Sequence, residues 1–119
     1  MKKKLTIVIP AFNEAQYIPN LIKKISEVNL SRYDISKEIV LVDDGSTDNT
    51  KRIVKKFKKI RYIKQTNQGK GRAVQKGIKK AKGSIVLVQD ADLEYDPRDY
   101  SKLIKPFLTK KKIAVYGSR

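Results

Sequence analysis

The sequence predicts an α/β fold in which helices flank a mainly parallel sheet. Short β-branched apolar runs alternate along the chain with segments whose apolar residues repeat at helical spacing. This alternation is typical of right-handed βαβ units. The chain has 119 residues, the size of one domain, so we expect residues 1–119 to form a single domain.

Five apolar runs predict the strands. Residues 5–9 read Leu-Thr-Ile-Val-Ile, and residues 38–42 read Glu-Ile-Val-Leu-Val before two aspartates. Both runs are apolar enough to form buried strands of a parallel sheet. The remaining predicted strands are a weaker one at 60–63, the strong Ser-Ile-Val-Leu-Val run at 84–88, and a last one at 113–116.

Four segments between these runs predict helices. The first begins at Ile18 and has Pro19 in its first turn, where a helix tolerates proline. Asp48 can cap the second helix, the third is predicted over 71–81, and Pro97 opens the fourth. Their apolar stripes are Ile18, Leu21, Ile22, Ile25 and Val28; Ile53, Val54 and Phe57; Ala73, Val74, Ile78 and Ala81; and Tyr100, Leu103, Ile104 and Leu108.

Charge and composition exclude several classes of protein. The net charge is +16, which attracts phosphates or anionic lipid. The chain has no cysteine and no histidine, so it lacks thiol nucleophiles and imidazole bases, and any metal must be held by oxygen atoms. No apolar run approaches the roughly 20 residues that span a bilayer. We expect a cytoplasmic protein, with a peripheral position at the inner face of the membrane as an alternative.

The lysines between Lys51 and Lys64 have two interpretations. They form either a solvated helix face or a surface for anionic lipid headgroups. A basic protein that binds nucleic acid or a membrane through charge alone is therefore a competing hypothesis for the whole chain. The sequence contains no helix-turn-helix, zinc-finger or RNA-recognition motif, so we expect no specific nucleic-acid partner.

Polar residues follow the first four predicted strands. Because the carboxyl ends of parallel strands meet at one edge of a sheet, and ligands bind there, we place the candidate site at that edge. Several of these residues are carboxylates, although the chain as a whole is strongly basic. The four segments are 10–14, 43–48, 65–71 and 90–94.

Asp90, Asp92 and Glu94 alternate after the strand predicted at 84–88. In an extended segment, alternate side chains point to the same side, so the three carboxylates could converge on a cation. Mg²⁺ or Mn²⁺ suits such an all-oxygen site, which substrate phosphates commonly complete. The alternative is that Asp90 and Asp92 only shape a turn before the next helix.

Two other segments carry candidate ligand-binding groups. Asp43 and Asp44 provide more carboxylates than a tight turn needs, so one of them could accept hydrogen bonds from a base or ribose. Gly69 and Lys70 stand where a helix begins, and backbone N–H groups and a positive charge at that position favour a phosphate. An ordinary turn and an ordinary helix start are the alternatives.

The chain carries five motifs in a fixed order: Ile-Pro-Ala-Phe-Asn-Glu, Val-Asp-Asp-Gly-Ser-Thr-Asp, Asn-Gln-Gly-Lys-Gly-Arg-Ala, Asp-Ala-Asp and a closing Gly-Ser-Arg. Together they resemble the nucleotide-sugar half of family 2 glycosyltransferases, and the resemblance covers the whole chain. Within that family, Gln-Gly-Lys-Gly and Asp-Ala-Asp-Leu-Glu-Tyr-Asp-Pro are similar to the motifs of dolichol-phosphate and polyprenyl-phosphate hexosyltransferases. The resemblance implies a Rossmann-like GT-A domain that binds a nucleotide sugar.

The resemblance also implies a role for each residue that matches a family motif. The nucleotide-binding residues would be Pro10, Ala11, Asn13, Glu14, Asp43, Asp44, Gly69, Lys70, Asp90, Ala91, Asp92 and Arg119. Asp90 and Asp92 would hold Mg²⁺ or Mn²⁺ on the diphosphate, with Glu94 where related enzymes often have Gln. The catalytic residues would be Asp90, Asp92 and Arg119, and Arg119 would lie near the donor phosphates, as would Lys70.

The implied reaction is an inverting transfer of a hexose from GDP-mannose or UDP-glucose to a polyprenyl or dolichyl phosphate. A lipid phosphate is already anionic and needs no base, which fits a chain without histidine. Members of the family continue past the Gly-Ser-Arg motif into an acceptor-binding half, so we expect a truncated or split protein. The alternative is a nucleotide-sugar-binding module without transfer activity. We also expect a homo-oligomer or a partner chain that covers apolar surface.

Overall fold

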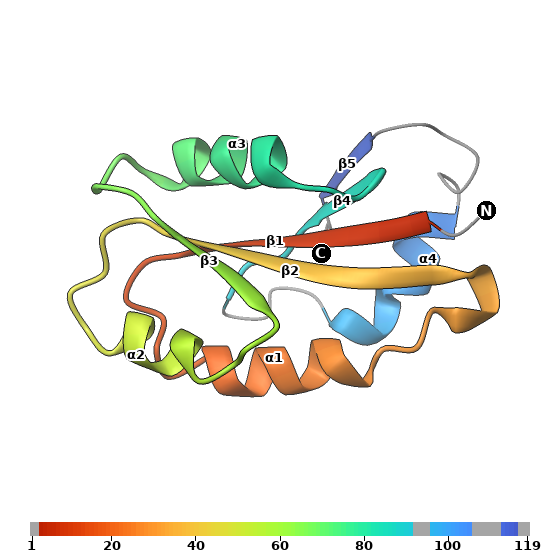
Figure 1. Cartoon of the computed structure of the whole chain (residues 1–119), viewed down its shortest axis with the longest axis horizontal. Coiled ribbons are helices and arrows are strands. Elements are labelled where there is room, and N and C mark those ends of the chain that lie inside the picture. The colour runs from red at the N-terminus through yellow and green to blue at the C-terminus, as the bar shows by residue number, and fades with distance from the viewer. Residues whose placement is uncertain (1–2, 92–95, 106–112, 117–119) are drawn as a thin grey trace.

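The computed structural model describes residues 3–91, 96–105 and 113–116. Five strands form one sheet in the order β3-β2-β1-β4-β5, and every neighbouring pair is parallel (Figure 1). The predicted α/β fold with a parallel sheet is therefore confirmed. The strands are β1 (Lys3–Ala11), β2 (Ile35–Asp43), β3 (Ile60–Lys64), β4 (Ile85–Val88) and β5 (Ile113–Tyr116).

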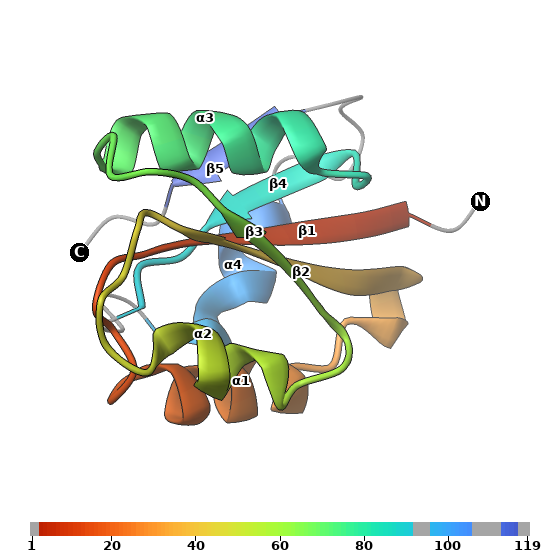
Figure 2. The same cartoon turned by 60° about the vertical axis from the view of Figure 1, so that its left-hand side comes forward.

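Helices cover both faces of this sheet. Helix α3 lies on one face, and α1, α2 and α4 lie on the other, as the rotated view shows (Figure 2). The helices are α1 (Ile18–Glu27), α2 (Thr50–Lys55), α3 (Lys70–Lys80) and α4 (Tyr100–Ile104), with short 3₁₀ helices η1 (Ser31–Tyr33) and η2 (Pro97–Asp99). None of the helices in the described ranges is both long enough and apolar enough to cross a membrane.

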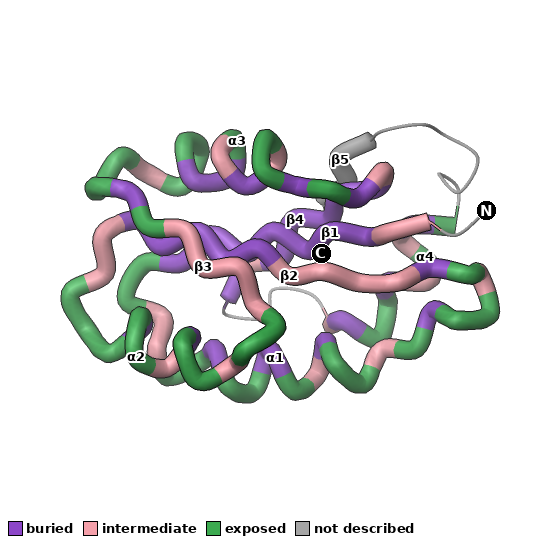
Figure 3. Tube along the Cα trace, in the orientation of Figure 1, coloured by how far each residue is buried: buried purple, intermediate pink, exposed green. Residues whose placement is uncertain are grey.

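Side chains of β1 alternate between the two layers. Leu5, Ile7 and Ile9 pack with α1 and α4 in the larger core cluster, whereas Val8 packs with residues of α3 and β4 in a second cluster. This alternation follows from the period of two along a strand. The central strands are buried along most of their length, whereas the edge strand β3 is only half-buried (Figure 3). The core therefore centres on β1.

The elements differ from the sequence-based expectations mainly at their ends. Helix α2 begins at Thr50 with Asn49 in the cap position, and Asp48, the expected cap, accepts hydrogen bonds from both N and Oγ1 of Thr50. Pro97 opens a 3₁₀ turn before α4, a common start for a helix. Leu108, expected on the stripe of that helix, lies outside the described residues.

Gly77 lets α3 approach β1 closely. A Cβ atom at this position would overlap the side chain of Val8, which is fully buried beneath the helix. Gly71 lies in the same helix, but a Cβ atom there would meet no atom within 4 Å. Substitutions at the two positions therefore distinguish the effect of close packing at Gly77 from the effect of any glycine on helix stability.

Gly77→Ala should lower the free energy of unfolding by about 1–3 kcal/mol, because the added methyl group must displace Val8 or the helix. Gly71→Ala, the matched control, should raise it by about 0.5–1 kcal/mol because alanine has the higher helix propensity. Urea unfolding followed by circular dichroism measures both changes. Equal effects of the two substitutions would contradict the close contact between α3 and β1.

Candidate functional site

A pocket of about 160 Å³ opens at the carboxyl ends of the strands. The chain reverses its direction across the sheet between β1 and β4, since β2 lies on one side of β1 and β4 on the other. Ligands of open α/β sheets bind at such a switch point. The pocket is lined by Pro10, Ala11, Phe12, Glu14, Asp44, Lys70, Ala73 and Asp90. Six of the predicted site residues are therefore brought together there.

Backbone hydrogen bonds continue past the strands and fix the ends that form this pocket. Gln89 N donates to Val8 O at 2.9 Å, and Asp44 N donates to Ala11 O at 2.9 Å. Pro10 lies two residues after Val8 and so faces the same neighbour, β4, at a point where the pairing of β1 with β4 has ended. Its missing N–H costs no ladder hydrogen bond there. Pro10 and Asp90 both line the pocket beyond the point where this pairing ends.

The Asp44 carboxylate holds the loop that precedes α3. Asp44 is 6% exposed, and its Oδ1 accepts hydrogen bonds from Gln65 Nε2 (2.8 Å) and Gln68 N (2.7 Å). Its Oδ2 accepts one from Gly69 N (3.0 Å). Burial raises the pKa of Asp44, but these three hydrogen bonds outweigh it and leave the pKa below its ordinary value. The ionised carboxylate therefore positions residues 65–69.

Gln65 adds an unused acceptor beside Asp44. Its side chain is buried, and its Oε1 receives no hydrogen bond from the part of the chain that the structure describes. The orientation of the amide follows from Asp44, because a carboxylate accepts and so must face the NH₂ group of Gln65. Gln65 is absent from the pocket lining, so its amide supports Asp44 from behind the pocket.

Asp43 makes its contacts within the protein. Its Oδ1 accepts a hydrogen bond from Ser46 N (2.8 Å), and its Oδ2 accepts one from the Tyr62 hydroxyl (2.5 Å). Burial and the Asp43 carboxylate raise the pKa of Tyr62 well above its ordinary value, so the phenol stays protonated. Asp44 lines the pocket and Asp43 is absent from its lining. Between the two, the geometry favours Asp44 for the predicted contact with a base or ribose.

Asn13 joins two loops. It has a left-handed backbone (φ 52°), and its Oδ1 accepts hydrogen bonds from Thr47 N (2.7 Å) and Asp48 N (3.2 Å). Asn13 N in turn donates to Ser46 Oγ at 2.9 Å. The side chain thereby fixes the loop after β1 against the loop after β2. Its predicted contact with a nucleotide stays a prediction.

Lys70 and Asp90 form an ion pair in the lining of the pocket. Lys70 Nζ lies 2.5 Å from Asp90 Oδ1, and both residues belong to the pocket lining. Lys70 is the first residue of α3 and follows Gly69, whose φ of 98° is accessible to glycine but strained for other residues. The ion pair shows that a cationic group and a carboxylate can meet at this point of the pocket.

Gln89 and Tyr100 fix the backbone at Asp90, and the sequence did not identify them as site residues. The Tyr100 hydroxyl donates to Gln89 Oε1 (2.8 Å), and Gln89 Nε2 donates to Asp90 O (3.1 Å). Both side chains are fully buried. A glutamine at the end of an apolar strand, directly before Asp90, was the available signal. The helical spacing of Tyr100 predicts only a core position for it.

The remaining predicted residues are placed as follows. The Ala91 side chain is buried in the core, so a ligand could reach only its backbone. Gly69 donates its N–H to Asp44. Asp92, Glu94 and Arg119 lie outside the described residues. Among residues 3–91, 96–105 and 113–116, no three metal-binding side chains group around one point, so the predicted metal centre stays a prediction.

An open parallel sheet with its pocket at the switch point is the architecture of nucleotide-binding α/β proteins. Comparison with known protein families narrows this class. The family model for glycosyl transferase family 2 matches residues 6–119, and the chain belongs to that family. Its sheet and helices have the GT-A fold of known glycosyltransferases.

Two curated relatives and one solved structure illustrate the similarity. The chain is 34% identical to UDP-N-acetylglucosamine--dolichyl-phosphate N-acetylglucosaminyltransferase of Methanococcus voltae, over 98% of this chain and 52% of the relative. It is 34% identical to undecaprenyl-phosphate 4-deoxy-4-formamido-L-arabinose transferase of Pseudomonas syringae pv. syringae, over 87% and 32%. A mannosyltransferase of Pyrobaculum calidifontis in complex with GDP-Man and Mn²⁺ superposes with a TM-score of 0.76 at 26% identity, covering 92% of this chain and 33% of that structure.

The chain spans about a third to a half of the length of these curated relatives. The matched part includes the strand ends that carry the pocket, because the family model extends from residue 6 to residue 119. The similarity therefore concerns the part of this chain that contains the pocket, and about a third to a half of each of these relatives.

Asp44→Asn should lower the free energy of unfolding at pH 7 by about 1–3 kcal/mol, because an amide cannot accept all three hydrogen bonds. The lowered pKa of Asp44 means that its stabilising effect is present above its unfolded value of about 4 and is lost as the pH falls through the folded value. Urea titrations at a series of pH values should therefore show the gap between wild type and variant narrowing below about pH 4.

Asp34→Asn is the matched control. Asp34 is exposed and has a left-handed backbone (φ 56°), which asparagine tolerates well. We expect this variant to stay within about 0.5 kcal/mol of wild type at pH 7. A pH-independent gap for Asp44→Asn would contradict the role of the ionised carboxylate.

Proposed function

We propose that this chain forms the donor-binding part of a glycosyltransferase that transfers a hexose, mannose or glucose, from a nucleoside-diphosphate sugar to a polyprenyl or dolichyl phosphate. One observation carries the proposal. The pocket at the switch point brings Pro10, Glu14, Asp44, Lys70 and Asp90 together from four separate segments. The named relatives support the substrate class, since one uses a UDP-sugar and dolichyl phosphate and another an undecaprenyl phosphate.

The lining residues suggest how a donor would lie. Pro10 and Ala11 provide an apolar wall for the nucleoside, and Asp44 and Glu14 provide carboxylates for its polar groups. Lys70 stands at the N-terminus of α3, where its charge and the helix dipole both favour a phosphate. The base and ribose would therefore lie toward Asp44, and the diphosphate toward Lys70 and Asp90.

The chemistry of the pocket fits a divalent cation. Glu14, Asp44 and Asp90 line the pocket, and their carboxylate oxygens are ligands that suit Mg²⁺ or Mn²⁺. The Pyrobaculum mannosyltransferase was solved with Mn²⁺. Asp90 would hold the cation, with Asp92 and Glu94 as the other predicted ligands. A bound divalent cation would act as a Lewis acid for the departing nucleoside diphosphate. Lys70 pairs with Asp90 in the structure.

The proposed acceptor requires no base from this chain. A lipid phosphate is ionised at neutral pH and can attack the anomeric carbon directly, with inversion. The described pocket residues would bind and orient the donor, and Lys70 would stabilise the charge that develops on its diphosphate.

A thermal-shift titration tests the donor site. The ligands are GDP, UDP and their mannose and glucose conjugates, each with and without Mn²⁺, at about 0.15 M salt. We expect the melting temperature to rise with the nucleotides of one base only, guanine or uracil, and only when Mn²⁺ is present. Asp90→Asn should abolish the metal-dependent part of the shift, because it removes a charged metal ligand. Asp34→Asn, at the opposite end of the sheet, should keep the shift. A folded protein that responds to no donor, with or without Mn²⁺, would overturn the proposal.

Lys70→Gln tests the placement of the diphosphate. This variant should weaken binding of the nucleoside diphosphate by about ten-fold, since a charge-assisted hydrogen bond to phosphate is lost. Binding of the corresponding nucleoside, which has no phosphate, should be unchanged. Lys102→Gln on α4 makes the same change in net charge and should leave both affinities unchanged. Isothermal titration calorimetry measures these affinities, and an equal loss for nucleoside and nucleotide would exclude the phosphate contact.

A further inference from the structure

Half of the basic residues lie in one continuous stretch without acids. No aspartate or glutamate occurs between residues 49 and 89, whereas residues 51–82 contain 14 of the 28 lysines and arginines. This stretch forms α2, β3 and α3: β3 is an edge strand of the sheet, and α2 and α3 lie on opposite faces of the sheet (Figures 1 and 2). We call the exposed cations of residues 51–82, apart from Lys70 of the pocket, the basic face: Lys51, Arg52, Lys55, Lys56, Lys58, Lys59, Lys64, Arg72, Lys79, Lys80 and Lys82.

The described residues do not neutralise this face. In the stretch 51–82, Arg61 pairs with Glu38 (3.6 Å) and Lys70 pairs with Asp90, and neither cation belongs to the basic face. Lys55 lies 5.0 Å above the ring of Tyr62, which leaves its charge in place. A solvated helix face usually mixes both signs of charge, so a face with one sign favours a polyanionic partner.

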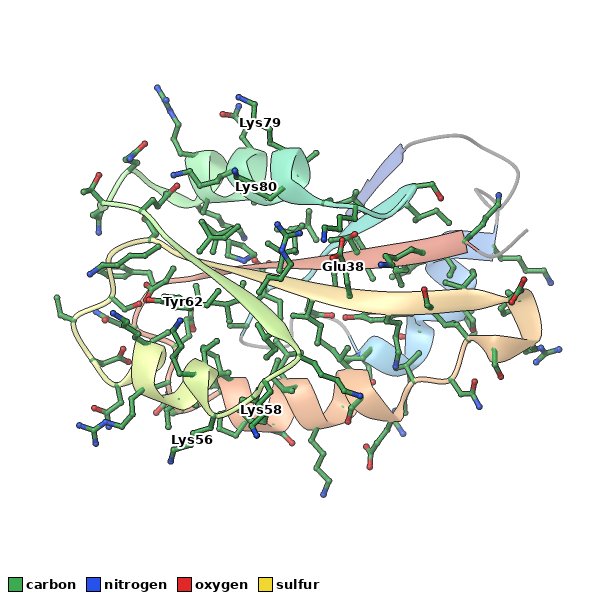
Figure 4. All side chains as sticks on the ribbon, in the orientation of Figure 1. Glu38, Lys56, Lys58, Tyr62, Lys79 and Lys80 are labelled. Carbon is green, nitrogen blue, oxygen red and sulfur yellow. The ribbon has the colours of Figure 1, made fainter. Side chains whose placement is uncertain are left out.

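The arrangement of these charges favours an extended anionic surface. Lys56 and Lys58 follow α2 on one side of β3, and Lys79 and Lys80 lie on α3 on the other side, with Tyr62 between them (Figure 4). The large exposed hydrophobic residues of the described chain are Phe12 and Tyr17, which lie outside residues 51–82. The face therefore lacks the exposed aromatic platform on which single-stranded nucleic acids stack.

We propose that the basic face docks the protein onto the anionic headgroups of a lipid bilayer. The attraction comes from charges on three elements and requires no inserted side chain. Lys70, which lies within the same stretch as the first residue of α3, also lines the donor pocket. Docking would therefore hold the pocket beside the headgroups, where a lipid-linked phosphate lies. The proposal rests on the charge distribution and is independent of transfer activity.

Vesicle co-sedimentation tests this proposal. Wild type should bind vesicles of phosphatidylcholine with about 30% phosphatidylglycerol at about 0.15 M salt, and should release at about 0.5 M. Vesicles of phosphatidylcholine alone should not bind. The variant Lys56→Gln with Lys79→Gln takes one cation from each side of β3 and should weaken binding by about 25-fold, or five-fold for each cation.

The control variant, Lys102→Gln with Lys105→Gln, has the same net charge but changes α4 and its C-cap. It should bind within about two-fold of wild type, because these lysines lie outside the face. An equal loss in both variants would overturn the proposal, since net charge alone would then explain binding. Single-stranded RNA that displaces the protein from vesicles and shows the same dependence on Lys56 and Lys79 would also overturn it in favour of nucleic acid.

Discussion

The Asp44 carboxylate is the interaction on which the geometry of the site depends. It stands at the end of a buried strand and accepts three hydrogen bonds from the loop before α3. Those bonds fix Gly69 and hence the first residue of α3, Lys70. Because two of the donors are backbone N–H groups, the position of the helix start is tied to the sheet rather than to a mobile side chain. The pocket is thereby preorganised before any ligand binds.

A second constraint is the electrostatic contrast between the pocket and the rest of the chain. The protein carries a net charge of +16, yet the switch point gathers Glu14, Asp44 and Asp90 around Lys70. Carboxylates at close range repel one another unless cations or N–H donors compensate them. The structure compensates Asp44 with hydrogen bonds and Asp90 with Lys70. Asp90 is thus paired with an exposed, flexible side chain, whereas two of the three donors to Asp44 are backbone N–H groups.

Much of the fold follows from the sequence because its signals are local. Apolar β-branched runs and helical stripes predicted the five strands and four α-helices of the described residues, and the rule that parallel strands carry sites at their carboxyl ends predicted the position of the pocket. The sequence could not predict that Asp44 lines the pocket and Asp43 does not. Both follow the same strand, and only the tertiary partners, Tyr62 for one and the loop at 65–69 for the other, distinguish them. The contribution of Gln89 was hidden for the same reason, since its partner Tyr100 comes from another element.

The donor pocket and the basic face require opposite arrangements of charge, and the topology of the fold provides both. A donor pocket needs few, well-fixed charges in a confined space, which the ends of central strands provide. A bilayer needs many cations spread over a wide area, and it tolerates their mobility. An edge strand with a helix on either side supplies that area, because its elements pack on the sheet through one face and leave the other to solvent. Helix α3 belongs to both: its first residue lines the pocket, and its last turn carries Lys79 and Lys80. The proposed donor site and the proposed membrane surface therefore share this helix.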